Sequence, residues 1–242
     1  MAKEKIYEDV ANYYDKLWGD LEKEAKTGVL SRHRMILLKL KQAGFKSKST
    51  LLEIGCGIGT LSSYLAKVNS AGKVDAVDIS PATIEFAKNK YKGQKNLEFF
   101  VSDMTNFSIV RKYDFILFPD VLEHIPVEAH DNIFNTIKNL CHENSIVAIN
   151  LPTARSLRWF HKNNPEALQI IDQDIESDSL IGQLYKHGFY LISKETYSLY
   201  FVQPDYEWFV FKVQREFNKM ELKSKMSVLL NNIKLRILNL LN

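Results

Sequence analysis

The stretch Leu51-Leu52-Glu53-Ile54-Gly55-Cys56-Gly57-Ile58-Gly59-Thr60 decides the fold. A short apolar run, typical of a buried strand, ends in three glycines at alternate positions, and a helical pattern follows over 61–68. Glycine allows a sharp turn and lets a ligand lie against the main chain. The helix after the loop contributes free N–H groups and a positive dipole end. The segment therefore predicts a strand–turn–helix unit that holds a ligand at the turn.

The same alternation of strand and helix continues on the carboxyl side of this loop. Apolar strands are predicted at 73–77, 97–101, 113–118 and 145–151, and helices are predicted from Pro81 and over 127–141. Such alternation implies right-handed crossovers and a parallel sheet covered on both faces. Two further strands, 189–194 and 206–213, follow without a long crossover and are expected to be antiparallel. We predict an α/β, doubly wound, mostly parallel seven-stranded sheet with an antiparallel last strand pair.

The pattern also divides the chain into three parts. Residues 1–45 are mostly helical and are predicted to form an N-terminal helical cap. Residues 46–215 form the main domain, interrupted by a polar and aromatic insertion at about 152–177. Residues 216–242 are predicted to form a basic amphipathic C-terminal helix.

Composition narrows the class of protein. Of the 242 residues, 45% are hydrophobic and 25% are charged, which is typical of a soluble globular protein. The two cysteines, Cys56 and Cys141, cannot form a disulfide framework, so we expect a reducing, cytoplasmic compartment. We expect no signal peptide and no membrane-spanning helix, because the first residues are charged and no apolar run is long enough. A net charge of +3 does not indicate a nucleic-acid partner.

Asp78 narrows the ligand class further. It ends the second strand, 19 residues beyond Gly59. A carboxylate at this point can accept hydrogen bonds from both hydroxyls of a ribose. We therefore predict an adenosine-containing ligand. The alternative is a glycine-rich turn with a solvated aspartate.

Four motifs at the ends of four successive strands resemble those of the Rossmann-like, class I S-adenosylmethionine-dependent methyltransferases. They are Glu53-Ile54-Gly55-Cys56-Gly57-Ile58-Gly59, Val77-Asp78-Ile79-Ser80, Val101-Ser102-Asp103-Met104 and Phe118-Pro119-Asp120-Val121-Leu122-Glu123-His124-Ile125-Pro126. The last motif resembles the small-molecule branch of that class. The resemblance covers about residues 49–151 and implies the same fold, with S-adenosyl-L-methionine as cofactor.

The resemblance also implies roles for individual residues. Gly55, Gly57 and Gly59 would pass under the methionine portion and the ribose, and Asp78 would bind the ribose hydroxyls. Ile79 would lie against the adenine, with Asp103 and the Met104 N–H at its edge. Glu53 and Cys56 belong to the same cofactor-binding loop, and Cys56 is interpreted as a packing residue. Tyr14 resembles a residue that caps the cofactor; ordinary helix packing is the alternative.

His124 is the candidate general base for a methyl acceptor. It follows the fourth strand, and imidazole has a suitable pKa for taking a proton from a hydroxyl. The alternative is that His124 packs against the cofactor or caps the next helix. Asp120 is the second candidate base or an orienting partner, and Glu123 is expected to be structural. The histidines and cysteines are scattered without ligand spacing, so no metal site is predicted.

The insertion is predicted to cover the acceptor. Arg155, Arg158, Trp159, His161 and Asp172 could bind a polar or anionic acceptor, or could belong to a solvated loop. We expect methyl transfer to a small-molecule hydroxyl, with a sugar or glycan precursor first. The alternatives are a quinone or lipid-precursor O-methyltransferase and a small-molecule N-methyltransferase. A nicotinamide oxidoreductase and a non-catalytic cofactor-binding subunit are further rivals.

The C-terminal segment differs in charge from the rest of the chain. From Lys212 onward there are seven basic and two acidic residues. Apolar residues recur at helical spacing, at Leu222, Met226, Leu229, Leu230, Ile233, Ile237, Leu240 and Leu241. This stripe is expected to dock on its own domain or on a second subunit. The alternatives are peripheral contact with a membrane surface and a disordered end.

Overall fold

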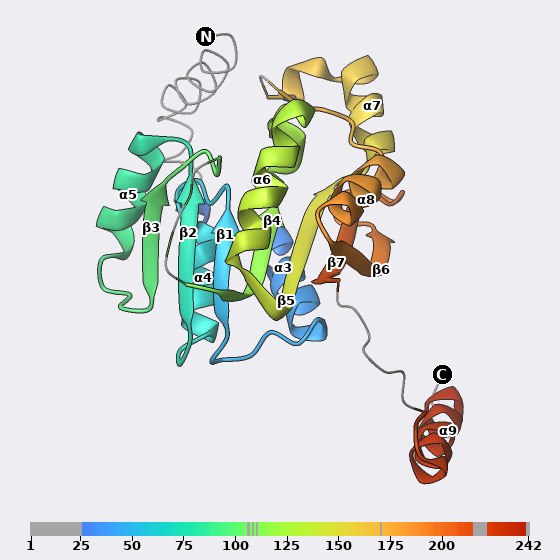
Figure 1. Cartoon of the computed structure of the whole chain (residues 1–242). Helices are drawn as coiled ribbons and strands as arrows, with labels where there is room; N and C mark the ends of the chain where they lie inside the picture. The colour runs from blue at the N-terminus through green and yellow to red at the C-terminus, as the bar shows by residue number, and fades with distance from the viewer. Residues whose placement is uncertain are drawn as a thin grey trace.

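A computed structural model describes residues 26–105, 107, 109, 111–169, 171–214 and 222–240. Figure 1 shows a sheet between two layers of helices. The elements in chain order are α3 (Ser31–Gln42), β1 (Thr50–Ile54), α4 (Thr60–Val68), β2 (Lys73–Asp78), α5 (Pro81–Tyr91), β3 (Leu97–Val101), β4 (Tyr113–Pro119), η1 (Leu122–His124), α6 (Val127–Leu140), β5 (Cys141–Pro152), α7 (Ala154–Asn163), η2 (Pro165–Ala167), α8 (Ser177–Lys186), β6 (Phe189–Tyr197), β7 (Tyr206–Val213) and α9 (Lys225–Leu240).

The sheet confirms the predicted fold class. Its seven strands lie in the order β3-β2-β1-β4-β5-β7-β6. The first five strands pair in parallel, while β7 is antiparallel to both β5 and β6. The chain moves from β1 outward to β3 and then returns to β4 on the other side of β1. The boundary between β1 and β4 is therefore the switch point, where open α/β sheets bind ligands at the carboxyl ends of their strands.

Alternate strand residues build two hydrophobic cores on opposite faces of the sheet. Leu51 packs in the core that α3, α4 and α5 cover, whereas the next residue, Leu52, packs in the core that α6 and α8 cover. Both side chains are fully buried. Burial on both faces explains why the central strands have continuous apolar sequences.

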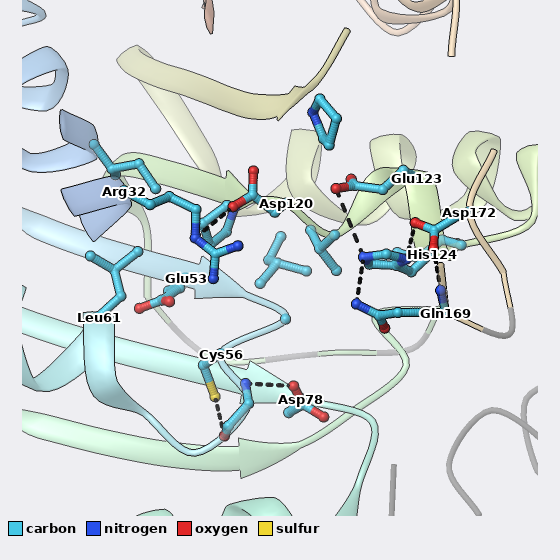
Figure 2. Close-up of a pocket in the computed structure, with 18 of the residues that line it drawn as sticks. Arg32, Glu53, Cys56, Leu61, Asp78, Asp120, Glu123, His124, Gln169 and Asp172 are labelled. Atoms are coloured by element: carbon cyan, nitrogen blue, oxygen red, sulfur yellow. Dashed lines mark hydrogen bonds and ion pairs between the residues drawn. The ribbon is translucent and has the colours of Figure 1, made fainter. Parts of the chain in front are cut away.

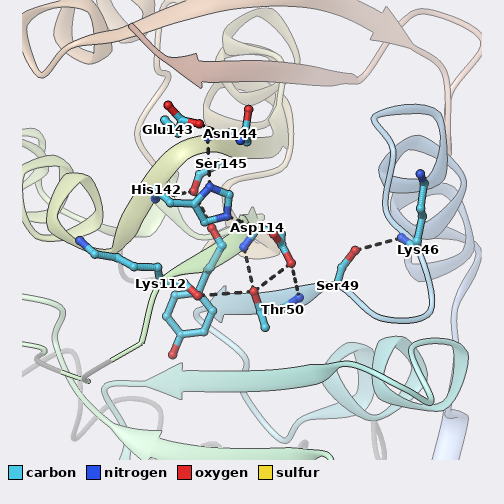
Figure 3. Close-up of polar contacts among 10 residues, drawn as sticks. Lys46, Ser49, Thr50, Lys112, Asp114, His142, Glu143, Asn144 and Ser145 are labelled. Atoms are coloured by element: carbon cyan, nitrogen blue, oxygen red, sulfur yellow. Dashed lines mark hydrogen bonds and ion pairs between the residues drawn. The ribbon is translucent and has the colours of Figure 1, made fainter. Parts of the chain in front are cut away.

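The opposite edge of the sheet, at the amino ends of the strands, is joined by polar side chains (Figure 3). The Asp114 carboxylate on β4 accepts from the Thr50 N–H at 2.8 Å, and Thr50 Oγ1 accepts from the Asp114 N–H at 2.9 Å. The His142 ring on β5 lies 3.0 Å from the same carboxylate. These contacts fix the relative positions of β1, β4 and β5, and thereby of the loops at their carboxyl ends.

Several boundaries differ from the sequence prediction. Strand β5 begins at Cys141 rather than at 145, and β6 extends to Tyr197 rather than ending at 194. The predicted insertion contains the helices α7 and η2. Of the N-terminal cap, only residues 26–45 are described, so Tyr14 lies outside the described residues. None of the described helices has both the length and the apolar character that crossing a bilayer requires.

Candidate active site

A cavity of about 460 Å³ opens at the carboxyl ends of β1, β2, β4 and β5. Its lining includes residues from the glycine loop, from the segment after β4 and from the insertion. Figure 2 shows side chains from these segments facing one another. The cavity is large enough for a nucleoside cofactor together with part of a small acceptor. Residues of the insertion, among them Phe160 and Gln169, therefore line the cavity.

The three glycines of the loop have different surroundings. All have positive φ values, 76°, 49° and 76° at Gly55, Gly57 and Gly59. A Cβ atom on Gly55 would lie 2.3 Å from Cγ2 of Val121, and one on Gly59 would lie 2.6 Å from the Phe99 ring. A Cβ atom on Gly57 would meet nothing within 4 Å. Gly57 therefore borders open space in the cavity, whereas Gly59 does not line it and is required for packing.

Asp78 lies at the end of β2, directly beside this loop. Its Oδ2 accepts from the Gly57 N–H at 2.7 Å, and its Oδ1 accepts from the Ser80 N–H at 3.0 Å. Burial raises the pKa of Asp78, while these two backbone donors act in the opposite direction. The carboxylate thus closes the glycine turn and still lines the cavity, with lone pairs for a ribose.

Glu53 and Cys56 lie at the base of the loop. The Ser62 hydroxyl donates to Glu53 Oε2 at 2.7 Å. Burial raises the pKa of Glu53 to about 8, and this hydrogen bond opposes the shift. Burial, with Asp78 and Glu53 nearby, also raises the pKa of the Cys56 thiol well above its usual value. Cys56 is buried in the loop, and a raised pKa makes a thiol a weaker nucleophile at neutral pH.

The predicted adenine-binding residues also line the cavity. Ile79, Asp103 and Met104 lie together at its β2–β3 end. Asp103 Oδ1 accepts from the backbone N–H and the hydroxyl of Thr105, at 2.9 and 2.8 Å. The Met104 N–H donates to Ser102 Oγ at 3.0 Å. Contact between this N–H and an adenine therefore requires the serine hydroxyl to be displaced or shared.

Asp120 is held in place by residues that the sequence did not single out. Its Oδ2 lies 3.0 Å from Arg32 Nε on α3, and its Oδ1 accepts from the Asn150 amide at 2.7 Å. Asp120 has a positive φ of 53°, which turns the chain sharply after β4. Oδ1 thus accepts from a fixed donor, whereas Oδ2 lies beside the Arg32 cation and has no hydrogen-bond partner among the described residues. The ion pair orients Asp120 and Arg32 relative to each other.

His124 ends the short helix η1, and the cavity cover contacts its ring (Figure 2). Its Nδ1 lies 2.7 Å from the Ile171 carbonyl oxygen and 3.2 Å from Asp172 Oδ1. Since both neighbours only accept, Nδ1 carries the proton in the neutral ring. Nε2 is then an acceptor, and the Gln169 side-chain amide donates to it at 3.3 Å. The ring therefore presents a basic nitrogen to the cavity.

Glu123 was expected to be structural, but its carboxyl group forms part of the cavity wall. It is 1% exposed, and its Oε2 has no hydrogen-bond partner among the described residues. Its Oε1 lies 3.8 Å from His124 Nε2. Burial raises the pKa of Glu123 well above the usual range, and nearby Asp120 adds to the effect. A neutral Glu123 can donate to an acceptor oxygen beside the imidazole.

Aromatic side chains from α7, from β7 and from the loop between β6 and β7 also line the cavity. Phe160 from α7 lies edge-on to Phe201 at 5.8 Å between ring centres, and both line the cavity. Tyr200 packs on Tyr206 at 6.1 Å. Asp205 accepts from the backbone N–H groups of Leu199 and Tyr200, at 2.6 and 3.0 Å, and so shapes this loop. None of these aromatic residues carries a local sequence signal, because their proximity depends on how the insertion folds over β7.

The arginines of the insertion are not part of the site. Arg155 and Arg158 do not line the cavity, and Arg158 pairs with Asp174 and Glu176 on the surface. Trp159 is 53% exposed and packs beside Phe160. Of the charged residues predicted there, Asp172 faces the cavity. The prediction that these arginines bind an anionic acceptor is therefore wrong.

Carboxyl groups dominate the charge of the cavity. Arg32 is the single arginine or lysine among its described lining residues, and it is paired with Asp120. The acidic lining residues are Glu53, Asp78, Asp103, Asp120, Glu123, Asp172 and Asp205. Burial favours the neutral form of Glu53 and Glu123, but the other carboxylates still outnumber Arg32, which favours a cationic or neutral ligand over a phosphate. Among the described residues, no group of His, Cys, Asp and Glu is arranged to hold a metal ion.

Comparison with known proteins agrees with this geometry. The family described as "Methyltransferase domain" matches residues 45–198. The chain belongs to this family. S-adenosylmethionine is the cofactor of its class I members. The open face of Gly57, the carboxylate of Asp78 and the acidic lining fit that cationic nucleoside. The family match argues against a nicotinamide oxidoreductase.

The chain is also similar to individual methyltransferases. A malonyl-[acyl-carrier protein] O-methyltransferase of Ilyobacter polytropus is 38% identical over 87 residues, which cover 36% of this chain and 32% of that protein. A methyltransferase structure from Clostridium acetobutylicum has a TM-score of 0.63 at 15% identity, over 84% of this chain and 99% of that one. Magnesium protoporphyrin IX methyltransferase from Synechocystis, solved with bound S-adenosylhomocysteine, has a TM-score of 0.60 at 19% identity, over 76% of this chain and 81% of that one.

Proposed function

We propose that this chain transfers a methyl group from S-adenosylmethionine to a hydroxyl group of an uncharged small molecule, with His124 as the general base. The orientation of the His124 ring carries the proposal. Its Nδ1 donates to the Ile171 carbonyl at 2.7 Å, which leaves Nε2 as a proton acceptor in the cavity. When bound, the cofactor supplies an activated methyl group, so the chain must orient the acceptor, take its proton and exclude water.

A carboxylate beside Nδ1 stabilises the His124 ring once Nε2 has taken a proton. Asp172 Oδ1 lies 3.2 Å from Nδ1, close enough to stabilise the positive charge on a protonated ring. The Asp172 carboxylate is itself oriented by the backbone N–H of Gln169. Because the Gln169 side chain occupies Nε2 in the described conformation, an acceptor must displace that amide before it reaches the base.

Glu123 and His124 together match the hydrogen-bonding capacity of a hydroxyl. A neutral Glu123 donates to the oxygen, while Nε2 of His124 accepts the hydroxyl proton. Arg32 is proposed to bind the cofactor instead of the acceptor. Its side chain lines the cavity beside Asp120. Its remaining N–H groups can donate to a carboxylate, such as that of the cofactor's methionine portion.

The lining also supports a class of acceptor. An uncharged sugar or glycan precursor fits a cavity that combines aromatic faces with carboxyl oxygens, because its ring stacks and its hydroxyls donate. Nucleotide sugars and nucleic acids are disfavoured by the acidic lining. A quinone or lipid precursor fits the aromatic wall of Phe160 and Phe201 as an alternative. An amine is the second candidate, favoured by the excess of carboxyl groups.

Methyl transfer from labelled cofactor into a panel of neutral sugars, quinol precursors and amines, read by mass spectrometry, tests the function. His124→Gln is expected to lower kcat by about a hundredfold or more while leaving S-adenosylhomocysteine binding intact. His187→Gln is the matched control, because His187 bonds Asp131 and Asn135 outside the cavity. Normal turnover of His124→Gln would exclude the base role. Cofactor binding without a methylated product would instead indicate a non-catalytic subunit.

A further inference from the structure

The C-terminal helix α9 presents an apolar face that the other described residues do not cover. Every residue from Lys225 to Ile237 is exposed. The apolar side chains of the stripe are 46–65% exposed, at Met226, Leu229, Leu230, Ile233 and Ile237. The prediction that this stripe docks on its own domain is therefore wrong for the described residues. An uncovered stripe of this size on a helix is typical of a binding surface.

Basic residues border the stripe on both sides. Viewed along the axis at about 100° per residue, the five stripe residues fall within a sector of about 100°. Arg236 lies about 20° outside one border and Lys234 lies about 40° outside the other. Lysine and arginine at these borders can bury their alkyl stems beside apolar side chains and extend their charges outward. This arrangement matches a helix that lies in the plane of a lipid headgroup layer.

The charge of the C-terminal segment distinguishes between two partners for the stripe, a second copy of the helix and a lipid surface. Residues 222–242 include Lys223, Lys225, Lys234 and Arg236 and no aspartate or glutamate. Two such helices packed stripe to stripe would bring like charges together at both borders, with no carboxylate of the segment to neutralise them. An anionic lipid surface supplies the opposite charge and an apolar phase at once.

Strand β7, the last strand before α9, runs from the cavity edge of the sheet to the other edge. Strand β7 is antiparallel to β5, and Tyr206 pairs with Pro152 at the cavity edge while Lys212 pairs with Ile146 near the other edge. The carboxyl end of β7 therefore lies at the edge of the sheet opposite the cavity (Figure 1). Membrane contact through α9 would hold the domain near a bilayer.

We propose that α9 binds the surface of an anionic lipid bilayer, with the stripe of Met226, Leu229, Leu230, Ile233 and Ile237 in the headgroup layer and Lys234 and Arg236 at its borders. The helix lies along the surface, because its 16 residues span about 24 Å, too short for the hydrocarbon core at any tilt. This inference concerns a surface separate from the catalytic cavity, and it stands or falls independently of the proposed methyl acceptor.

Vesicle co-sedimentation of the full chain tests the proposal. Vesicles of phosphatidylcholine alone are compared with equimolar phosphatidylcholine and phosphatidylglycerol, at low and high salt. We expect binding to the anionic vesicles to be at least about tenfold tighter and to weaken with salt. Absence of vesicle binding, or equal binding to both compositions, would overturn the proposal.

Two matched pairs of substitutions locate the surface. Leu229→Ser with Ile233→Ser removes stripe side chains and is expected to weaken anionic-vesicle binding by about tenfold or more. Val228→Ser with Leu235→Ser makes the same change on the opposite face and should leave binding within about twofold. Lys234→Gln with Arg236→Gln should reduce the preference for anionic lipid, with Lys223 and Lys225 left in place. A lipid-free dimer that the stripe pair dissociates, by light scattering, would show instead that a second copy covers the stripe.

Discussion

The carboxylate of Asp120 lies 3.0 Å from Nε of Arg32, which joins the first described helix to the segment that follows β4 at the wall of the cavity. Asp120 is 8% exposed at its side chain, whereas Arg32 keeps 30%. The pair is therefore partly solvated, and its loss should cost less than the loss of a fully buried ion pair.

Removal of Arg32 should destabilise the fold by leaving the Asp120 carboxylate without its cation. We expect Arg32→Ala to lower the free energy of unfolding by about 2 kcal/mol, measured in urea. Arg32→Ala with Asp120→Asn should recover part of that loss, because the unpaired charge is gone. Arg34→Ala, an exposed position on the same helix, serves as control. Equal effects of Arg32→Ala and Arg34→Ala would contradict the structural role of the pair.

The raised pKa of Glu53 predicts a pH dependence of stability. Its folded-state pKa of about 8 lies above the ordinary carboxyl value, so between those two values the unfolded chain releases a proton that the folded chain keeps. The stability of the cofactor-free protein should therefore fall as pH rises from about 5 to 8. Glu53→Gln, which mimics the protonated acid, should flatten that part of the curve. Thermal melts across this range make the comparison, and parallel curves for the two proteins would refute the prediction.

Substitutions at Gly57 and Gly59 should differ in their effects on cofactor binding and on stability. Gly57→Ala meets no neighbouring atom, so it should cost about 1–2 kcal/mol for the positive φ and strongly weaken S-adenosylhomocysteine binding. Gly59→Ala introduces the same strain at a positive φ and also places a Cβ atom against Phe99. It should therefore lower the free energy of unfolding more than Gly57→Ala does. Calorimetric titration together with chemical unfolding distinguishes the two outcomes. Tighter binding by Gly57→Ala than by the unaltered chain would contradict the cavity assignment.

Asp172 should affect turnover without affecting cofactor affinity. Asp172→Asn removes the negative charge 3.2 Å from His124 Nδ1, so the protonated ring loses its stabilisation. We expect kcat to fall about tenfold or more, with S-adenosylhomocysteine affinity unchanged. Asp174→Asn is the control, because Asp174 pairs with Arg158 on the surface. An equal loss of kcat in both variants would point to a general effect on the cover.

The strand–loop–helix core was predictable because its signals are local. The glycines, Asp78 and Asp103 occupy strand ends, and a parallel sheet brings strand ends to one edge. His124 was found for the same reason. Arg32 and Gln169 were not found, since neither position carries a pattern and each reaches the site only through tertiary folding. Their partners lie 88 and 45 residues away in sequence.

The basic residues of the insertion led to a wrong prediction of an anion-binding site, for a physical reason. A basic residue in a predicted cover suggests an anion site, but the Arg158 side chain turned to the nearby carboxylates Asp174 and Glu176. Glu123 was undervalued because its three-residue helix gives no periodicity from which to assign a face. Its unpaired Oε2 is visible only once burial is known.

A main-chain oxygen, that of Ile171, selects the tautomer of His124. Every amino acid carries that oxygen, so a substitution at position 171 that keeps the backbone in place leaves the tautomer of the imidazole unchanged. Relatives could thus diversify what they methylate by altering this segment without rebuilding their proton acceptor.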